Sequence, residues 1–391
     1  MRLMIVAECG HYRRGGGIVA PGHFRREIDL WARMFDEVDL ITPFPREEAP
    51  HGVELYVSTN IEFVVGNGAF SRDPWDRIVS IGRSAMTVTR IIRSIARSDA
   101  VHIRCPCRNG MLALLVGRIL KRPVYVKWAG EWPVRRDAPW SWRFQEKNIR
   151  GLDRPAVVTV YSREEQDPDW IYETETSSLT RAQVEEEIRE IGSLPAERGD
   201  TLVWVGRLTR NKRVPEMIRG LELVFGAYPR LKLEVVGDGP DRVAAEHEAQ
   251  LLGLDERVVF HGWLGWQDLK DLYSRARLLL LPSATEGFPK VIHEAALFGT
   301  PAVVFQVGAL SRIVDGKGGV ASPPGDFEAF GRVVGRILAD DGRWGQLSAC
   351  SAEWAAGLSI ERVVNRYRSL CEKEWGVRLH PLATTSSTGT G

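Results

Sequence analysis

The sequence predicts an α/β protein of two domains, each a doubly wound parallel sheet covered by helices. A chain of 391 residues normally divides its hydrophobic interior between two domains. In both halves, short runs of leucine and β-branched residues alternate with longer amphipathic stretches, as in repeated strand–helix units over a parallel sheet. The charged stretch 181–200, which contains three consecutive glutamates, suits an exposed helix that connects the halves.

Each half contains five segments with the character of buried strands. In the first half we expect strands at 3–7, 38–41, 100–103, 124–127 and 157–160, and helices near 22–35, 83–96, 109–120 and 139–150. In the second half we expect strands at 202–205, 231–236, 257–260, 278–281 and 302–305, and helices near 214–226, 240–252, 267–275, 290–298 and 326–339.

These segments place the two domains at 1–190 and 200–358. A helix over 359–377 is expected to complete the first domain, and residues 380–391, rich in Ser, Thr and Gly, are expected to be disordered. In open parallel sheets, ligands bind beyond the carboxyl ends of the strands. Two such domains facing each other would form a cleft, so functional residues should be sought in the loops that follow the strands.

The composition is that of an ordinary globular protein, with 44% hydrophobic and 26% charged residues. No apolar stretch approaches the ~20 residues of a membrane span, and the opening run 3–7 is too short for the core of a signal peptide. The five cysteines are an odd number without the paired spacing of a zinc site, so they are expected to be reduced thiols. These features predict a cytoplasmic protein.

Charge is distributed unevenly along the chain. Residues 1–155 carry 25 Lys and Arg against 17 Asp and Glu, a net +8, and the remainder carries 27 against 34, a net −7. A basic first half can attract anionic lipid headgroups, phosphorylated acceptors or nucleic acid, or it can be a solvated arginine-rich surface. Because no nucleic-acid recognition motif is present, we do not expect a nucleic-acid partner.

The most informative segment is 282–290, which follows an all-leucine strand and leads into a predicted helix. Pro289 suits the first turn of that helix, whose unpaired amides and dipole favour a phosphate group. Gly287 lets a ligand come close to the backbone. Glu286 precedes the helix, and Glu294 lies about two turns along on a similar side, so two carboxylates would bracket an anion site. Alternatively, Glu286 pairs with the helix dipole and Glu294 is solvated.

Two further segments have the character of phosphate-binding loops. A predicted strand ends in Gly206-Arg207, and Lys212 follows five residues later, so a guanidinium and an ammonium would lie at the edge of the sheet. A solvated turn is the alternative. Three glycines, Gly15, Gly16 and Gly17, follow the first strand and precede a helix that begins near His23. They would let backbone amides approach a phosphate or sugar, or they form a mobile loop.

From about residue 202 to 326 the chain resembles the donor-binding half of the family 4, group 1 glycosyltransferases, which have the GT-B fold. Four segments carry the resemblance, in the family's order: Val205-Gly206-Arg207-Leu208 with Lys212, Val236-Gly237-Asp238-Gly239-Pro240, Phe260-His261-Gly262-Trp263-Leu264, and Glu286-Gly287-Phe288-Pro289-Lys290 through Glu294. The first half matches only the family's general layout, and the glycine loop after its first strand is its best match.

The resemblance implies a role for each matching residue. Arg207 and Lys212 would hold the donor diphosphate, and Glu294 would bind the ribose hydroxyls. Glu286 would contact the donor sugar, which the amides of Gly287, Phe288 and Lys290, with Pro289 between them, would help to orient. Leu264 would touch the base through its backbone, and Gly16 and Gly17 would approach the donor. The family transfers with retention of anomeric configuration and needs no divalent metal, so no cofactor besides the nucleotide-diphosphate sugar is implied.

The chain departs from the family in its first half. Many members have a His after the fourth or fifth strand, facing the transferred sugar, where this chain reads Lys127-Trp128-Ala129-Gly130-Glu131-Trp132. Lys127 or Glu131 would serve instead, with His23 as a further residue on the acceptor side. The tryptophans nearby would stack on an acceptor or pack in the core. Asp167-Pro168-Asp169 imitates a metal-binding motif of the other major transferase fold, but we expect a turn there.

The resulting hypothesis is a retaining, metal-independent transferase. It would move a hexosyl unit from a UDP- or GDP-sugar to an acceptor, in the assembly of bacterial surface polysaccharide or lipid-linked glycan. Association with the inner face of a membrane fits the basic first half. One alternative is a GT-B enzyme acting on a small soluble or natural-product acceptor. Another is a catalytically silent protein that binds sugar nucleotides, which the missing His leaves open.

Overall fold

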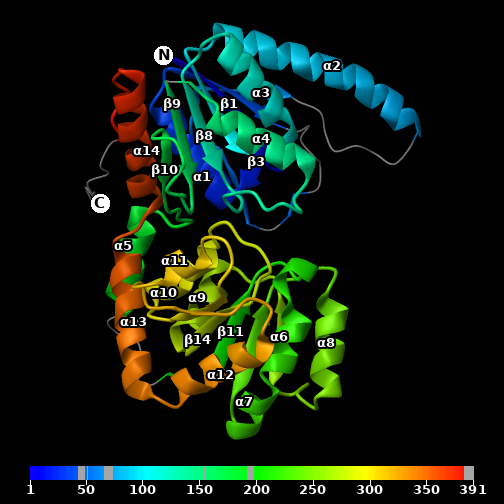
Figure 1. Cartoon of the computed structure of the whole chain (residues 1–391), viewed down its shortest axis with the longest axis vertical. Coiled ribbons are helices and arrows are strands. Elements are labelled where there is room, and N and C mark those ends of the chain that lie inside the picture. Colours follow the sequence, from blue (N-terminus) through cyan, green and yellow to red (C-terminus); the bar gives the residue numbers. More distant parts are fainter. Residues whose placement is uncertain (43–48, 51, 66–73, 154, 192–197, 383–391) are drawn as a thin grey trace. The chain divides into compact units, whose positions relative to one another are not determined.

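The computed structural model describes residues 1–42, 49–50, 52–65, 74–153, 155–191 and 198–382. The chain divides into two compact units (Figure 1). The first comprises Met1–Glu175 together with Ile360–Gly391, and the second comprises Thr176–Ser359. Of the predicted disordered tail 380–391, residues 383–391 lie outside the described residues. The prediction is wrong for 380–382, because the His380 ring forms a hydrogen bond with Asp36 at 2.8 Å and Leu382 is buried.

The first unit is built on a seven-stranded parallel sheet with the order β10-β9-β8-β7-β1-β4-β6. Its strands are β1 (Arg2–Val6), β4 (Glu37–Thr42), β6 (Ile61–Val65), β7 (Ala100–Cys105), β8 (Val124–Trp128), β9 (Ala156–Val160) and β10 (Ile171–Glu173). The chain adds β4 and β6 on one side of β1 and the later strands on the other, so the sheet is doubly wound.

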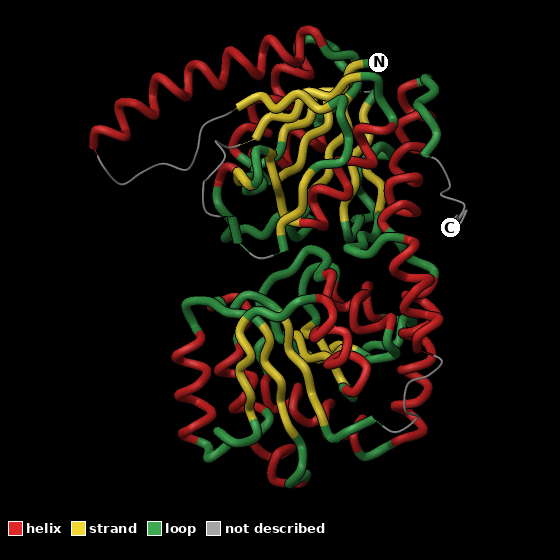
Figure 2. The backbone as a smooth tube through the Cα atoms, turned by 180° about the vertical axis from the view of Figure 1, so that it is seen from behind, coloured by secondary structure: helices red, strands yellow, loops and turns green. Residues whose placement is uncertain are grey.

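Helices cover both faces of this sheet (Figure 2). The helices α1 (Gly22–Arg33) and α14 (Ile360–Trp375) pack together on one face, and α2 (Pro74–Arg97), α3 (Arg108–Ile119) and α4 (Trp140–Arg150) cover the other. Side chains along β7 and β8 alternate between these faces, as the period of a strand requires. Val101 and Val126 enter the apolar core under α2, α3 and α4, whereas Arg104 and Lys127 lie on the α1 side with Glu27.

A second, three-stranded antiparallel sheet packs beside α1. It joins β2 (Tyr12–Arg14), β3 (Gly17–Pro21) and β5 (Val53–Leu55). Gly15 and Gly16 make the two-residue turn between β2 and β3, with φ angles of 57° and 79° that favour glycine. The glycine run, which we interpreted as a loop, is therefore largely the tip of a hairpin. We did not predict this sheet because its strands are only three to five residues long.

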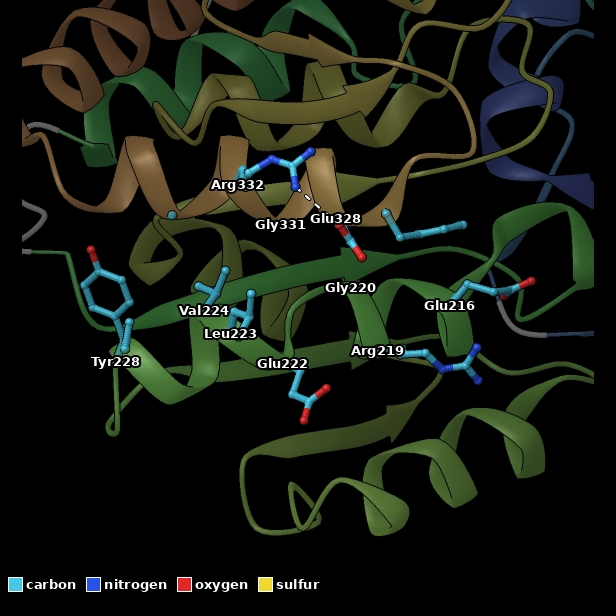
Figure 3. Close-up of a pocket in the computed structure, with 13 residues that line it drawn as sticks. Glu216, Arg219, Gly220, Glu222, Leu223, Val224, Tyr228, Glu328, Gly331 and Arg332 are labelled. Atoms are coloured by element: carbon cyan, nitrogen blue, oxygen red, sulfur yellow. Dashed lines mark hydrogen bonds and ion pairs between the residues drawn. The ribbon is translucent and has the colours of Figure 1, made fainter.

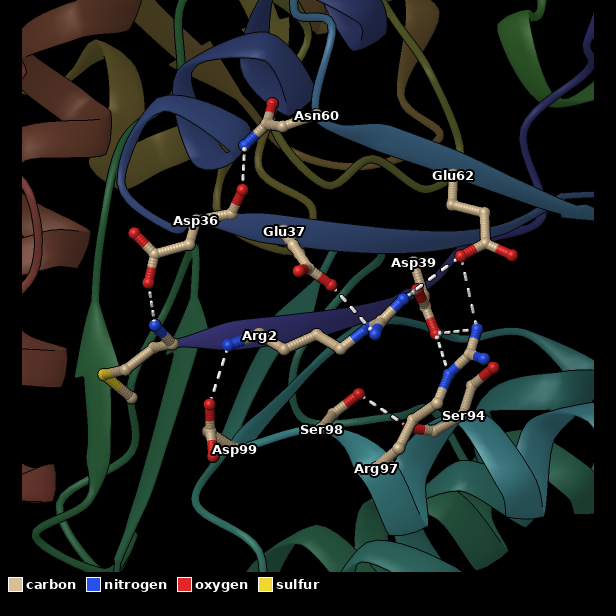
Figure 4. Close-up of polar contacts among 11 residues, drawn as sticks. Arg2, Asp36, Glu37, Asp39, Asn60, Glu62, Ser94, Arg97, Ser98 and Asp99 are labelled. Atoms are coloured by element: carbon tan, nitrogen blue, oxygen red, sulfur yellow. Dashed lines mark hydrogen bonds and ion pairs between the residues drawn. The ribbon is translucent and has the colours of Figure 1, made fainter.

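A charged network joins the amino ends of β1 and β4 to the end of α2 (Figure 4). The carboxylate of Asp39 is fully buried and accepts from Arg2 at 2.9 Å and from Arg97 at 2.8 Å. Both arginines also reach the exposed Glu62. Because a buried carboxylate is stable only when it is paired, Asp39 fixes these three elements relative to one another.

The second unit contains a six-stranded parallel sheet with the order β13-β12-β11-β14-β15-β16. Its strands are β11 (Thr201–Val205), β12 (Lys232–Val236), β13 (Val258–Gly262), β14 (Leu278–Leu281), β15 (Ala302–Phe305) and β16 (Val320–Ser322). The direction of strand addition reverses between β11 and β14. The prediction of two doubly wound parallel sheets is thus confirmed, and all ten predicted strands are present within one or two residues of their expected ends.

The helices of the second unit also form two layers. On one face lie α6 (Val214–Gly220), α7 (Glu222–Ala227), α8 (Arg242–Leu251) and α12 (Phe327–Leu338), and on the other α9 (Trp266–Arg275), α10 (Lys290–Leu297) and α11 (Leu310–Val314). The helix α13 (Asp341–Ala356), which we did not predict, packs on α10, as does α5 (Arg181–Ile191).

We had placed residues up to 190 in the first domain, whereas α5 lies in the second unit. The reason is a set of polar contacts from α5 to α9. The Trp266 indole donates to Glu187 at 3.0 Å, and Lys270 pairs with Glu190 at 2.7 Å. Glu187 is almost fully buried by these contacts, which a freely exposed linker helix would not show.

Candidate functional site

The loops that carry the predicted donor residues follow four neighbouring strands of the second unit. These strands, β13, β12, β11 and β14, are adjacent in the sheet and parallel, so their carboxyl ends meet along one edge. The loops after β11 and β14 flank the point where strand addition reverses. Open α/β sheets bind ligands at such a switch point, so the topology identifies this edge as the candidate site.

Arg207 projects from a backbone segment that is held on both sides. The Gly206 amide donates to Val236 O at 3.0 Å, and the Leu208 amide donates to Asp238 O at 3.0 Å. The Arg207 side chain between them is exposed, and no ion pair or hydrogen bond occupies its guanidinium within the described residues. A rigid backbone therefore presents an uncompensated guanidinium at the edge of the sheet.

Two glycines make this backbone contact sterically feasible. A Cβ added to Gly237, whose φ is 121°, would lie 1.8 Å from Gly206 O, and one added to Gly239 would lie 2.2 Å from Leu208 O. Neither position tolerates a side chain, since non-bonded heavy atoms cannot approach so closely. We predicted no role for these two glycines, although they belong to one of the segments that carry the family resemblance. Their Gly-x-Gly spacing after a strand was the available signal.

Lys212 and Glu286 form an ion pair between the loops after β11 and β14. Their side chains are 19% and 12% exposed. Asn211 aligns the two loops, because its side chain donates to Thr285 O at 2.9 Å and accepts from the Thr285 amide at 3.1 Å. We did not predict Asn211, which stands in no distinctive sequence pattern. The structure thus brings two of the predicted residues into direct contact.

The helix α10 begins where the loop after β14 ends. Pro289 is its N-cap and provides no side-chain hydrogen bond to the first turn. Phe288 is buried, whereas Gly287, Pro289 and Lys290 are partly exposed. This helix start, with its positive dipole end, lies in the same loop as Glu286, so cationic and dipolar groups converge with one carboxylate.

Glu294 lies one helical turn into α10 and is partly buried. It accepts hydrogen bonds from the Ser178 hydroxyl and, at 3.4 Å, from the Tyr273 hydroxyl. Burial, together with the charge of Glu294, raises the pKa of Tyr273 well above its usual value, so Tyr273 remains a donor at neutral pH. Ser178 was not predicted, because it comes from a segment that we had assigned to the first domain.

Leu264 follows β13 and is partly exposed. Its loop is tied to the loop after β12, since the Gly237 amide donates to Gly262 O at 2.7 Å and Gly262 adopts a φ of 70°. The structure thus ties Leu264 through the β12 loop to the backbone that carries Arg207. Its contact with a base remains a prediction.

The acceptor-side residues have different environments in the first unit. His23 is exposed in the first turn of α1, and Glu131 is partly exposed with its backbone oxygen accepting from the Trp128 indole at 2.9 Å. Gly16 lies in the hairpin turn, and Gly17 begins β3. Nothing in these positions tests their predicted roles.

Lys127 requires a correction, because it is only 1% exposed. Its ammonium donates to both oxygens of Glu27 at 2.8 Å. It therefore does not present its charge to an acceptor. Side chains along β8 alternate between the two faces of the sheet, and Lys127 lies on the face covered by α1. The sequence alone does not reveal that a carboxylate of α1, Glu27, lies on the same face.

Glu27 holds two buried cations. Arg104 lies 2.9 Å from the same carboxylate as Lys127. Burial alone would raise the pKa of Glu27, but the charges of Arg104 and Lys127 hold it well below its usual value. Burial lowers the pKa of Lys127 to about 8. Burial also lowers the pKa of His102 well below its usual value, so this side chain is neutral. Glu27, Arg104 and Lys127 together therefore carry a net charge of +1.

The charges of this cluster predict that removing the carboxylate and removing the ammonium will lower the stability of the protein by different amounts. Glu27→Gln leaves two buried cations without a carboxylate and should destabilise the protein by about 3–5 kcal/mol. Lys127→Met leaves Arg104 paired with Glu27 and should cost roughly 1–2 kcal/mol. Urea unfolding at pH 7 measures both. Because the pKa of Glu27 is lower in the folded chain, its contribution is present at neutral pH and is lost under acidic conditions. Equal losses in the two variants would contradict this prediction.

A separate groove of about 820 Å³ lies between α6–α7 and α12 (Figure 3). Its lining includes Arg219, Leu223, Tyr228 and Arg332, and it contains none of the predicted donor residues. The groove is formed by helix surfaces rather than by strand-end loops. We therefore do not assign the donor to it.

Asp167 is buried and paired with Arg150, and it accepts from the Trp132 indole at 3.0 Å. The Asp167-Pro168-Asp169 segment is thus part of a turn whose first carboxylate is already engaged. Across the described residues, no cluster of three or more His, Cys, Asp or Glu side chains is arranged to hold a metal ion. The helices in the described part of the chain also lack a segment with the length and apolar character of a bilayer span.

The architecture resembles solved glycosyltransferases of the GT-B fold. Anabaena HepE in complex with UDP matches with a TM-score of 0.69 at 17% identity, covering 96% of this chain and all of that one. WaaG, a glycosyltransferase involved in lipopolysaccharide biosynthesis, matches with a TM-score of 0.64 at 14% identity, also over 96% of this chain and all of that one. At these identities the likeness establishes the fold, which is GT-B.

Sequence comparison then identifies the kind of glycosyltransferase that the chain resembles. Residues 199–340 match the model of the family "Glycosyl transferases group 1". The 2-deoxystreptamine N-acetyl-D-glucosaminyltransferase of Streptomyces fradiae is 29% identical over 87% of this chain and 93% of its own. The lipopolysaccharide 1,6-galactosyltransferase of Salmonella typhimurium is 31% identical over 38% of this chain. These matches show that the chain is similar to group 1 glycosyltransferases, most specifically over residues 199–340.

Several matches cover only part of the relative. The aligned region spans 42% of the Salmonella enzyme and 24% of an exopolysaccharide phosphotransferase of Streptomyces coelicolor. These shorter alignments cover about two fifths to just over half of this chain.

Proposed function

We propose that this protein is a retaining glycosyltransferase that transfers a hexosyl unit from a UDP- or GDP-sugar. The observation that carries the proposal is the convergence of Arg207, the Lys212–Glu286 pair and the start of α10 at one sheet edge. A guanidinium that makes no ion pair with the described residues, at the same sheet edge as a helix N-terminus, favours a diphosphate. The similarity to the UDP complex of HepE supports UDP as the first donor nucleotide to test.

The proposed step needs stabilisation of a leaving diphosphate. The bond between the anomeric carbon and the phosphate oxygen breaks, and the electron pair departs with the diphosphate. Arg207, Lys212 and the α10 amides would stabilise this charge. The acceptor hydroxyl attacks from the side that the phosphate leaves, and its proton passes to a phosphate oxygen. Glu286 would stabilise the positive charge that develops on the sugar.

Retention by front-face transfer is preferred because we identify no second carboxylate for the role of nucleophile among the residues that the structure describes. A double-displacement mechanism would place one within about 5 Å of the general acid. Glu294, the nearest candidate along the chain, is engaged by Ser178 and Tyr273.

The cations already present support the proposal that transfer needs no metal ion. Two cationic side chains and a helix dipole would supply the neutralisation that a divalent ion gives in other transferases. We therefore expect transfer to proceed at an unchanged rate when EDTA is added to protein freed of metal ions. A loss of activity that Mg²⁺ or Mn²⁺ restores would contradict this part of the proposal.

The acceptor is expected to be a glycan, and we favour bacterial surface polysaccharide or lipid-linked glycan. A small soluble or natural-product acceptor is the second candidate, favoured by the 2-deoxystreptamine enzyme that matches over most of both chains. Incubation with labelled donor sugar and extraction into organic solvent separates them, because label enters the lipid phase only with a lipid-linked product. A silent sugar-nucleotide-binding protein would bind UDP without transfer or hydrolysis.

Two substitutions should separate the roles of the site residues. Arg207→Ala removes the unpaired guanidinium and should weaken UDP binding by about ten- to a hundredfold, measured by calorimetry. Glu286→Gln removes the charge that faces the sugar and should lower kcat by at least about a hundredfold with a smaller change in UDP affinity.

Arg332→Ala is the matched control, since Arg332 is an exposed arginine of the same unit that lies on α12, away from the strand-end loops. It should leave binding and turnover unchanged. The site assignment fails if Arg207→Ala and Arg332→Ala bind UDP with equal affinity.

A further inference from the structure

The outer face of α4 combines exposed aromatic side chains with unpaired cations. We call Arg136, Trp140, Arg143, Phe144 and Lys147 the α4 face. Positions 140, 143, 144 and 147 share one side of a helix, and Arg136 lies in the loop before it. Trp140 is 67% exposed and Phe144 is 37% exposed, with their rings 6.4 Å apart. Adjacent exposed apolar side chains rimmed by polar residues are typical of an interaction surface, whereas single ones need no explanation.

The helix is anchored by its opposite side. Gln145 and Ile149 are buried, and Ile149 belongs to the apolar core of the first unit. Gln145 accepts from the Cys107 amide at 3.1 Å. The α4 face is therefore not needed to hold the helix in place, and its side chains are available to a partner.

The charge on this surface is positive and uncompensated. Arg136, Arg143 and Lys147 are exposed and make no ion pair within the described residues. The acids nearest to them in sequence are already engaged. Asp137 forms a two-point pair with Arg135 at 3.0 and 2.9 Å, and Glu146 pairs with Arg150 at 3.0 Å. A partner with negative charge would meet three free cations.

The neighbouring helix α3 also carries exposed apolar side chains, with an exposed lysine just beyond its end. The helices α3 and α4 pack side by side on the same face of the sheet (Figure 1). Ile119 and Leu115 on α3 are 76% and 37% exposed, and Lys121 just beyond the helix is exposed without an ion pair in the described part of the chain. Both helices on this face of the sheet therefore carry exposed apolar and basic side chains.

We infer that the α4 face docks on the surface of an anionic lipid bilayer. Trp and Phe insert their rings at the boundary between headgroups and acyl chains, and flanking Lys and Arg side chains attract anionic headgroups. The Trp140 and Trp142 indole N–H groups make no hydrogen bond within the described residues, so they remain available to headgroups or water. A second copy of this chain is disfavoured, because two α4 faces would repel each other.

This inference goes beyond the proposed transfer reaction and does not depend on it. Vesicle binding is measured without donor or turnover. If the protein transfers sugar to a soluble acceptor but does not bind vesicles, the docking surface is wrong and the proposed function stands. If it binds vesicles but does not bind UDP, the proposed function is wrong and the docking surface stands.

The test is co-sedimentation of the full chain with vesicles of phosphatidylcholine alone or with 30% phosphatidylglycerol, about a third of the lipid. We expect binding only to the anionic vesicles and a decrease as salt rises. Arg143→Glu combined with Lys147→Glu should lower partitioning at least about 25-fold, because each cation near such a surface contributes roughly a fivefold gain. Trp140→Ser with Phe144→Ser should also reduce binding, but with little change in salt dependence.

The matched control is Arg332→Glu with Leu223→Ser, which alters an exposed arginine and an 83% exposed leucine in the second unit. It should bind as the unaltered chain does. Thermal unfolding checks that each variant is folded. The inference is overturned if the chain does not sediment with anionic vesicles, or if the α4 variants and the control bind equally. Binding to immobilised heparin without binding to vesicles would assign the surface to an acidic polymer instead.

Discussion

The candidate site depends on one backbone contact, the packing of the loop after β12 against the loop after β11. Gly237 and Gly239 allow this contact because neither position has room for a Cβ atom. The amides of Gly206 and Leu208 are satisfied by it, so the residue between them is held at both sides. Arg207 consequently needs no ion pair to be positioned, and its charge stays available for a ligand.

The other cation of the site is held in a different way. Lys212 is paired with Glu286, and Asn211 fixes the distance between their loops. Without an anion, the pair compensates its own charge in a partly buried place, which avoids the cost of an isolated ion. An arriving diphosphate would share the ammonium with Glu286 and leave the carboxylate beside the sugar. The guanidinium on its fixed backbone and the paired ammonium thus suit different parts of one donor.

The sequence predicted the sheets well because buried parallel strands appear as continuous apolar runs. The run 278–281 is four leucines, and its position in the sheet beside β11 follows from the parallel topology. The same reasoning placed Arg207, Lys212 and Glu286 in strand-end loops, and the structure brings Lys212 and Glu286 together. Short strands such as β2 and β5 carry too little pattern to be predicted.

Residues that act through distant partners were less predictable. Ser178 reaches Glu294 from 116 positions away, and Glu27 reaches Lys127 from 100 positions away. The spacing of residues along one sequence does not encode such pairs, and for that reason we interpreted Lys127 as a residue on the acceptor side. The exposed aromatics of α4 illustrate the converse. The sequence showed the tryptophans, but only burial separates Trp128 and Trp132 in the core from Trp140 on the surface.

In the proposed reaction, Arg207, Lys212 and the start of α10 bind the diphosphate of a nucleotide sugar. A crystal structure of the protein with UDP would reveal these contacts. We expect diphosphate oxygens within hydrogen-bonding distance, about 3 Å, of the Arg207 guanidinium and the first amides of α10. A diphosphate bound in the groove between α6–α7 and α12, or anywhere without contact to Arg207, would contradict this proposal.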